Sequence, residues 1–317
     1  MKARIVVIDL LAEAGHTKFV QETLKILDLK YDVLFVSSNS YLQKIKFSNS
    51  ITLNDELFHY KNKYEFVNSQ RRVIKKISNL NIIKRSDHIL LTSFENISLS
   101  LFWRRKNKTF LYLHNNLDRG KLSSFLFNRI NSNLSFFVFE EYIKNYLKKL
   151  SNECYHIPHP LSLIEHKPKS TSPKDFIFAP NLEFKSLSFK KALAFSQKSG
   201  LPLILKGEIM NRYGQNVISK PYFENYTDLI YNATYIILNI PYNYRISNIF
   251  YECMSFNKKI ILLEGYGKFG AEMKKFYPYN IYVGDLNDVE FNNLNNSKFL
   301  HQHSVKNIIE KYETIFK

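Results

Sequence analysis

Residues 235–263 read YIILNIPYNYRISNIFYECMSFNKKIILL, with an apolar run at each end and a polar loop and helix-like segment between them. The runs 235–240 and 259–263 are nearly continuous, as in parallel strands that are buried on both faces. Residues 248–256 follow Ser247, which is a favourable N-cap for a helix. Two neighbouring parallel strands must be joined by a long crossover segment, which is usually a helix. The segment therefore predicts a strand–helix–strand unit of an α/β sheet.

The same alternation extends through the whole chain. Apolar runs predict strands at 4–9, 32–37, 87–92, 109–114, 134–139, 175–179 and 202–206, and helical spacing predicts helices at 17–27, 63–83, 96–104, 140–150, 189–198, 226–232 and 304–316. This pattern is typical of doubly wound, Rossmann-like α/β domains. We expect two of them, because single cores stop growing at about 250–300 residues.

The boundary between the halves is predicted from composition. Residues 155–174 carry four prolines, several serines and little periodicity. We place the boundary near residue 165, which gives an N-terminal domain at 1–165 and a C-terminal domain at 166–317. Two doubly wound halves predict a ligand in a cleft between them, at the carboxyl ends of the strands.

Cysteine content and hydropathy bear on the compartment. The chain has two cysteines, Cys154 and Cys253, which do not form a metal-binding or redox spacing and fit a reducing compartment. No run of 18 apolar residues occurs. We expect a cytoplasmic protein, peripheral on the inner face of the cytoplasmic membrane if it contacts the membrane.

The formal net charge of +17 predicts an anionic partner. The alternative is a lysine bias of the kind that AT-rich genomes produce. Locally, basic residues interleave with apolar ones at 71–80, and at 101–106 three basic residues follow Phe102 and Trp103. A basic face bordered by Trp and Phe suits an anionic membrane surface, whereas a solvated helix edge is the alternative. No nucleic-acid motif is present, so we expect no nucleic-acid partner.

The loop and helix of 235–263 hold candidate anion ligands. The free amides of a helix that starts at Asn248, after Ser247, would bind a diphosphate. Arg245 would add bidentate phosphate contacts. Glu252, one turn into the helix, would accept hydrogen bonds from ribose hydroxyls. The alternative is that Glu252 is a solvated surface residue.

Residues 251–258, Tyr-Glu-Cys-Met-Ser-Phe-Asn-Lys, give this window a family resemblance. It resembles the donor-binding segment of family 4 of the retaining GT-B glycosyltransferases. In that family a glutamate, seven intervening residues and a second glutamate precede Ala-Met-Ala-x-Gly. The second glutamate falls on Glu252, and the resemblance implies that it binds ribose. The first, which contacts the donor sugar in the family, falls on Tyr244.

Three other segments are similar to the family's motifs. Residues 177–186 resemble its Gly-Arg-Leu segment, which implies that Lys185 neutralises donor phosphates, although Pro180 or Asn181 replaces the arginine. The loop after the first strand, with Glu13, Gly15 and His16, resembles the family's glycine-rich acceptor loop. The run 109–116 resembles the strand that ends in a histidine of the cleft, here His114. The alternatives are a core His114, an exposed His16 and a surface Lys185.

The resemblance implies a GT-B glycosyltransferase that moves a hexose from a nucleotide sugar to a glycan or lipid-linked acceptor, in bacterial surface polysaccharide synthesis. The acceptor would lie near Glu13, Gly15, His16 and His114, with the two histidines in catalytic roles. No cofactor is expected, and no metal, because the chain has no Asp-x-Asp. Two alternatives stay open. One is a non-catalytic nucleotide- or glycan-binding protein, and the other is an inverting transferase or epimerase with Asp9, Glu13 or His16 as the base.

Overall fold

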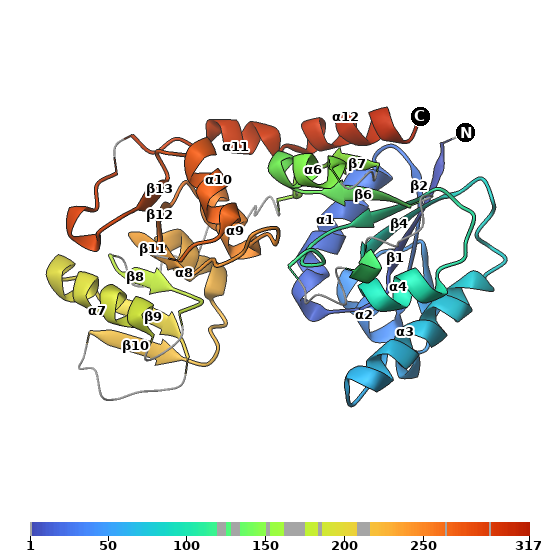
Figure 1. The fold of residues 1–317 in the computed structure, drawn as a ribbon, viewed down its shortest axis with the longest axis horizontal. Helices are drawn as coiled ribbons and strands as arrows, with labels where there is room; N and C mark the ends of the chain where they lie inside the picture. The colour runs from blue at the N-terminus through green and yellow to red at the C-terminus, as the bar shows by residue number, and fades with distance from the viewer. Residues whose placement is uncertain are drawn as a thin grey trace. The chain divides into compact units, whose positions relative to one another are not determined.

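The computed structural model describes residues 2–118, 125–127, 134–149, 153–161, 175–182, 186–207, 216–263, 265–291 and 293–317. The chain forms two compact units. Unit 1 comprises Met1–Ser162 together with Gln302–Lys317, and unit 2 comprises Leu163–His301. Each unit is an α/β domain built on its own sheet (Figure 1). The predicted boundary near residue 165 lies outside the described residues.

Unit 1 is built on a seven-stranded parallel sheet. Its strand order is β3-β2-β1-β4-β5-β6-β7. The strands are β1 (Arg4–Asp9), β2 (Asp32–Ser38), β3 (Ser50–Leu53), β4 (His88–Ser93), β5 (Thr109–Tyr112), β6 (Leu134–Val138) and β7 (Cys154–His156). Ile5 to Ile8 of the central strand β1 are fully buried, because helices cover both faces of the sheet.

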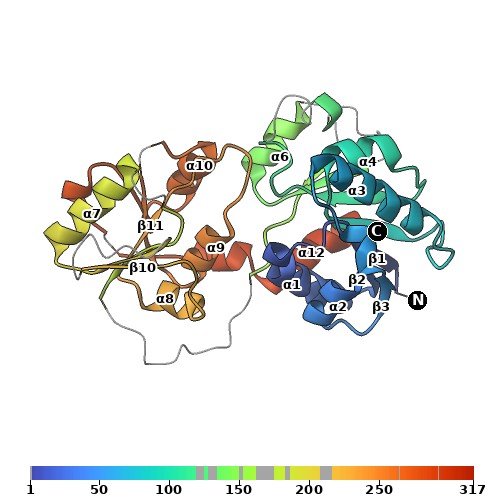
Figure 2. The ribbon, with the colours of Figure 1, turned by 90° about the horizontal axis from the view of Figure 1, so that it is seen from below.

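The helices of unit 1 form two layers around the sheet. They are α1 (Thr17–Asp28), α2 (Asn39–Ile45), α3 (Lys63–Ser78), α4 (Asn96–Phe102), α6 (Glu141–Lys148) and α12 (Val305–Ile315). Figure 2 shows α3 and α4 on one face of the sheet and α1, α2 and α12 on the other. This arrangement is the doubly wound topology.

The last helix, α12, belongs to unit 1, although we assigned its residues to the second domain. Tyr312 is buried and its hydroxyl hydrogen-bonds that of Tyr112 at the end of β5. Phe316 packs edge-on against Phe110 at a centroid distance of 5.0 Å. Glu313 pairs with Lys30 at 3.0 Å. Sequence periodicity shows that such a helix has an apolar face, but does not indicate which sheet buries it.

Unit 2 is built on a six-stranded parallel sheet with the order β10-β9-β8-β11-β12-β13. The strands are β8 (Ile177–Ala179), β9 (Leu203–Lys206), β10 (Val217–Lys220), β11 (Tyr235–Leu238), β12 (Lys259–Leu262) and β13 (Ile281–Val283). The helices are α7 (Leu187–Ser199), α8 (Tyr226–Asn232), α9 (Asn248–Ser255), α10 (Lys268–Phe276) and α11 (Ser297–Gln302). Ile177, Leu203, Ile237 and Ile261 form the centre of its core.

The predicted fold class, two Rossmann-like doubly wound domains, is confirmed, with corrections at short elements. Strands β3, β7, β10 and β13 were not predicted, because they are the edge strands of the two sheets, partly exposed and without the continuous apolar run of the inner strands. Residues 155 and 156 belong to β7 rather than to a linker. The helix expected to reach residue 83 ends at Ser78. Among the described helices, none is both long enough and apolar enough to cross a membrane.

Candidate functional site

The carboxyl edge of the unit 1 sheet is organised by a buried carboxylate, Asp9, at the end of β1. Its Oδ1 accepts hydrogen bonds from the amides of Leu11 (3.1 Å) and Ala12 (2.7 Å) and from the hydroxyl of Ser93 (2.6 Å). Its Oδ2 accepts from the hydroxyl of Thr92 at 2.8 Å. The residue is 0% exposed. Asp9 therefore fixes the loop after β1, and these four donors, together with its burial, argue against the role of solvent-facing base that was one alternative.

A second buried polar cluster follows β4 and β5 at the same edge. Glu95 caps α4 by accepting from the amides of Ile97 (3.0 Å) and Ser98 (2.8 Å). Asn96 and Asn116 bond each other across the two loops, because Asn116 Nδ2 donates to Asn96 Oδ1 at 2.8 Å and Asn96 Nδ2 donates to the Asn116 carbonyl at 2.9 Å. The sequence did not predict this cluster. Its only signal was polar residues directly after two apolar strands.

His16 and His114 lie together at this edge, as an acceptor site would require. Their rings stack with centroids 4.5 Å apart and an interplanar angle of 19°. Phe19 meets the His114 ring edge-on at 4.7 Å, and Phe139 lies 5.0 Å from it. His114 is only 7% exposed, whereas His16 is half-buried. The structure thus brings the two predicted histidines into contact, and their catalytic roles stay predictions.

The protonation of His114 follows from its surroundings. Its Nε2 lies 3.0 Å from the carbonyl oxygen of Thr92. A carbonyl only accepts, so Nε2 carries the hydrogen in this contact. Burial first, and then the neighbouring His16 and His159, lower the pKa of His114 well below its usual value. His114 is therefore neutral at physiological pH. By contrast, the buried Nδ1 of His16 has no hydrogen-bond partner among the described residues.

Glu13 and Gly15 form the outer part of the same loop. Both are exposed, and the carbonyl of Glu13 accepts from the His16 amide at 3.0 Å, in a short 3-10 turn at Ala14–His16. A methyl group added at Gly15 would meet no atom within 4 Å. The loop therefore leaves open space beside Gly15, which is consistent with the acceptor-side role that the resemblance implies.

In unit 2, the loop after β11 and helix α9 form as predicted. Ser247 is the N-cap of α9 and its hydroxyl accepts from the Phe250 amide at 3.4 Å. Asn248 and Arg245 are exposed, and the guanidinium of Arg245 lies 4.6 Å from the centre of the Tyr242 ring. The first amides of α9 and a cation thus lie on one exposed loop at the carboxyl edge of the sheet.

Glu252 is half-buried on α9, beside other ionisable groups. Burial, and then the nearby Cys253 and Glu252, raise the pKa of Tyr226 on α8. Burial also raises the pKa of the Cys253 thiol, with Glu252 adding to the effect. Glu252 is therefore neither buried nor fully exposed, and its role as a ribose ligand stays a prediction beside the alternative of a surface residue.

The loop that carries Arg245 is held by two neighbouring segments. Asn181, after β8, donates to the Asn239 carbonyl at 2.7 Å and accepts from the Asn239 amide at 3.1 Å. Gly267, before α10, lies against the backbone of Tyr242, where an added Cβ would come within 2.1 Å of the carbonyl oxygen. The ammonium of Lys268 lies 5.3 Å from the centre of the Tyr244 ring.

These supports explain two positions in the sequence. Asn181 stands near the place of the family's arginine and fixes the backbone at the end of β11. Gly267 was not singled out in the sequence, although the spacing Gly265, Gly267, Gly270 was a signal of close backbone approach. Lys185 lies outside the described residues. The described residues contain no group of three His, Cys, Asp or Glu side chains arranged to hold a metal ion.

Comparisons with known proteins agree with this architecture. No protein-family model and no curated protein sequence matches the chain. Among solved structures, a glycosyltransferase from Rickettsia africae ESF-5 is 14% identical, with 100% of this chain and 98% of that one covered and a TM-score of 0.62. Sucrose-phosphate synthase from Thermosynechococcus elongatus is 12% identical, with 100% and 95% covered and a TM-score of 0.61.

A third solved structure with this fold is an epimerase. UDP-N-acetylglucosamine 2-epimerase from Rickettsia bellii is 12% identical, with 98% of this chain and 88% of that one covered and a TM-score of 0.62. At such identities the likeness concerns the fold. The chain has the GT-B fold, which is built from two Rossmann-like domains.

Proposed function

We propose that this protein is a glycosyltransferase that moves a hexose from a nucleotide sugar to a glycan or lipid-linked acceptor, in the synthesis of a bacterial surface polysaccharide. The observation that carries the proposal is the unit 2 loop, where Arg245 and the first amides of α9 lie on an exposed surface after β11. The solved glycosyltransferase structures with the same fold support it.

In this proposal the donor binds to unit 2. The amides of Asn248 and Ile249 at the start of α9, with Arg245, bind the diphosphate, because both supply positive charge to an anion. Glu252 accepts hydrogen bonds from the ribose, and Lys185 adds a further cation. The Tyr242 and Tyr244 rings beside Arg245 and Lys268 offer flat surfaces to the nucleoside or the sugar.

The acceptor binds to unit 1, beside Glu13, Gly15, His16 and His114. The acceptor oxygen bonds to the anomeric carbon while the bond to the diphosphate breaks, and the electron pair leaves with the diphosphate. The acceptor's proton passes to the imidazole ring of His16, which is half-buried in the loop after β1. His114, neutral and fixed to Thr92, positions His16 by stacking. Arg245 and the helix amides stabilise the leaving diphosphate, which supplies the rest of the rate enhancement.

The experiment is release of nucleoside diphosphate from a panel of nucleotide sugars, with a mixture of glycan and lipid-linked acceptors. We expect release from one donor class that depends on acceptor. His16→Gln should lower kcat by about 10²–10⁴-fold, the usual range for a general base, with little change in stability. His301→Gln is the matched control, because His301 is exposed on α11. Unchanged turnover in a folded His16→Gln protein would refute the role of His16.

Two further candidate functions each have an observation in their favour. Tyr244, where the resembled family has an acid, favours a protein that binds a nucleotide without turnover. The likeness to the epimerase from Rickettsia bellii favours epimerisation. Product analysis separates all three functions, because an epimerase converts the donor sugar without acceptor, and a binding protein leaves the donor intact.

A further inference from the structure

The positive charge of this chain is concentrated in one segment of unit 1. Residues 60–108 contain twelve Lys and Arg and only three Asp and Glu. This segment therefore has an excess of nine positive charges, about half of the formal net charge of +17. Of the three acids, Asp87 and Glu95 are buried, at 4% and 5% exposed, and accept hydrogen bonds from nearby backbone amides. Glu65 accepts from the Lys61 amide at 2.8 Å. The exposed surface of this segment is therefore almost purely cationic.

Helix α3 carries most of this charge on its outer face. Val73, Ile74 and Ile77 are buried against the sheet, and the cations between them are exposed: Arg71, Arg72, Lys75 and Lys76. Tyr64 lies seven residues before Arg71, on the same face of the helix, and is 78% exposed. The outer face of α3 thus combines four cations with one large aromatic ring.

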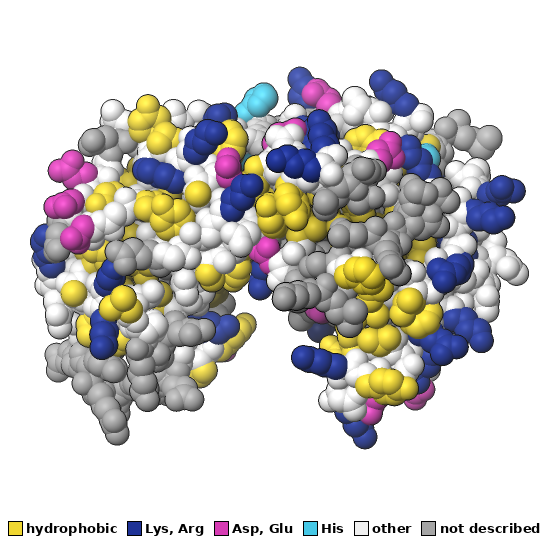
Figure 3. Space-filling model, in the orientation of Figure 1, with side chains coloured by type: hydrophobic (Ala, Val, Ile, Leu, Met, Phe, Trp, Pro, Cys, Tyr) yellow, Lys and Arg dark blue, Asp and Glu magenta, His cyan; other side chains and the backbone are white. Residues whose placement is uncertain are grey.

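Helix α4 adds apolar surface beside these cations. Leu101 is 45% exposed, and Phe102 is half-buried beneath the guanidinium of Arg71, which lies 5.6 Å from the ring centre. Exposed Arg104 and Lys106 follow directly. At the lower right of Figure 3, in the region of α3 and α4, hydrophobic side chains lie beside a group of Lys and Arg side chains.

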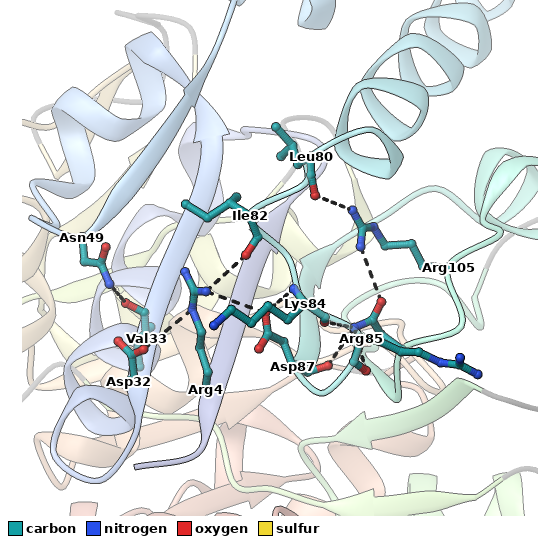
Figure 4. A network of polar contacts seen from close by, with 11 residues as sticks. Arg4, Asp32, Val33, Asn49, Leu80, Ile82, Lys84, Arg85, Asp87 and Arg105 are labelled. Atoms are coloured by element: carbon teal, nitrogen blue, oxygen red, sulfur yellow. Dashed lines mark hydrogen bonds and ion pairs between the residues drawn. The ribbon is translucent and has the colours of Figure 1, made fainter. Parts of the chain in front are cut away.

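Two residues that the sequence placed on this surface, Trp103 and Arg105, contact other parts of unit 1 instead. Trp103 is only 3% exposed, so it does not form the aromatic border that we expected. Arg105 donates to the carbonyl of Ile77 near the end of α3 (2.7 Å) and to that of Leu80 just after it (3.1 Å); Figure 4 shows the contact with Leu80. Figure 4 also shows the loop before β4, which is held by Arg4, whose guanidinium donates to the Ile82 carbonyl at 3.2 Å. The exposed aromatic and cationic groups are therefore those of α3 and its neighbour α4.

We propose that this α3–α4 surface, formed by Tyr64, Arg71, Arg72, Lys75, Lys76 and Leu101, docks on anionic phospholipid. Each cation near such a surface contributes electrostatic attraction, and Tyr64 and Leu101 suit the boundary between headgroups and acyl chains. A nucleic acid would gain from the cations but not from Leu101. The combination favours lipid.

The surface adjoins the loop that we assign to the acceptor. Gln70 lies on the buried side of α3, and its Nε2 donates to the Leu10 carbonyl at 2.9 Å, in the loop that continues to Glu13 and His16. Docking through α3 and α4 therefore places this loop near lipid, where a lipid-linked acceptor is located. The docking itself does not depend on the proposed transfer, since it involves neither donor nor acceptor.

The test is sedimentation of the full chain with vesicles of phosphatidylcholine alone and of phosphatidylcholine mixed with phosphatidylglycerol, at low and high salt. We expect binding to the mixed vesicles only, weakened by salt. Replacing Arg71, Arg72, Lys75 and Lys76 by Gln should weaken it about 600-fold, since one cation contributes roughly fivefold. The double variant Tyr64→Ser, Leu101→Ser should lose the part of the vesicle binding that persists at high salt.

The matched control is Lys44, Lys190, Lys220 and Lys306, all exposed, replaced by Gln. It loses the same charge elsewhere and should bind vesicles like the unaltered chain. Several results would overturn the proposal: equal binding to both kinds of vesicle, binding to neither, equal losses in the two four-site variants, or tighter binding of a single-stranded RNA than of vesicles at the same salt. Circular dichroism of each variant confirms that it is folded.

Discussion

The carboxyl edges of the two sheets are built in opposite ways. In unit 1 the polar residues of the edge, such as Asp9, Glu95 and Asn116, are at most 5% exposed and bonded to neighbouring loops. In unit 2 Arg245 and Asn248 of the corresponding edge are exposed. A buried network fixes side-chain positions in advance, whereas an exposed cation is accessible to an anion from solution. The first suits the positioning of a neutral acceptor and the second suits a diphosphate.

The largest effect is expected at the buried edge. Asp9→Ala leaves the amides of Leu11 and Ala12 and two hydroxyls without their acceptor, which should lower the free energy of unfolding by about 3–5 kcal/mol. The measurement is urea unfolding followed by the fluorescence of Trp103, the only tryptophan of the chain, which lies in unit 1. Asp32→Ala, at a carboxylate that is about half exposed, is the control. Similar losses in both variants would show that the buried Asp9 contributes no more to stability than a carboxylate at the surface.

A pair of glycines compares the loops of the two units directly. Gly267→Ala places a methyl group against the Tyr242 backbone and should cost about 1–3 kcal/mol of stability, with weaker nucleotide binding, because the loop must move. Gly15→Ala meets open space and should change stability by less than about 0.5 kcal/mol. Thermal unfolding of both variants, followed by a nucleotide titration, measures the difference. Equal costs would show that the loop contact at Tyr242 is loose.

Acid should destabilise unit 1 through its buried histidines. Burial lowers the pKa of His303 to about 4, and it also lowers the pKa of His114. Each histidine has a lower pKa in the folded protein than in the unfolded chain. Its contribution to the free energy of unfolding is therefore fully present above about pH 6.5 and is lost as the pH falls from there toward 4. Between pH 7 and 5, His303 alone should account for about 2 kcal/mol.

The measurement is urea unfolding at both pH values, followed by the fluorescence of Trp103. His303→Gln should remove that part of the pH dependence, while His301→Gln, at an exposed histidine of unit 2, should leave it unchanged. Equal free energies of unfolding at pH 7 and 5 would show that the buried histidines titrate as they do in the unfolded chain.

The smallest effect is expected at the exposed edge. Arg245→Ala should weaken nucleoside diphosphate binding by about 1–2 kcal/mol and leave stability unchanged, because the side chain is exposed. The loss should shrink as salt rises, since screening already weakens an exposed charge. Titration calorimetry at two salt concentrations measures it. A loss of stability in place of affinity would make Arg245 a structural residue.

The sequence predicts the fold because each long strand is a continuous apolar run and each long helix has an apolar stripe. It predicts the cap at Ser247 because a hydroxyl before a helix has a local geometry. It does not predict that α12 packs on unit 1, or that His16 stacks on His114, because both contacts join segments far apart in the chain. Trp103 is a further example, because the basic residues that follow it in the sequence do not indicate whether its ring is exposed or buried.

The most direct test of the account is nucleoside diphosphate binding by titration calorimetry to the unaltered chain, Glu252→Ala and Glu272→Ala. Both glutamates are half-buried on helices of unit 2, but only Glu252 lies on α9 after the Arg245 loop. We expect Glu252→Ala to weaken binding by about 1–3 kcal/mol, through loss of charge-assisted hydrogen bonds to the ribose, and Glu272→Ala to bind like the unaltered chain. Unchanged affinity in a folded Glu252→Ala protein would contradict the assignment of the donor site.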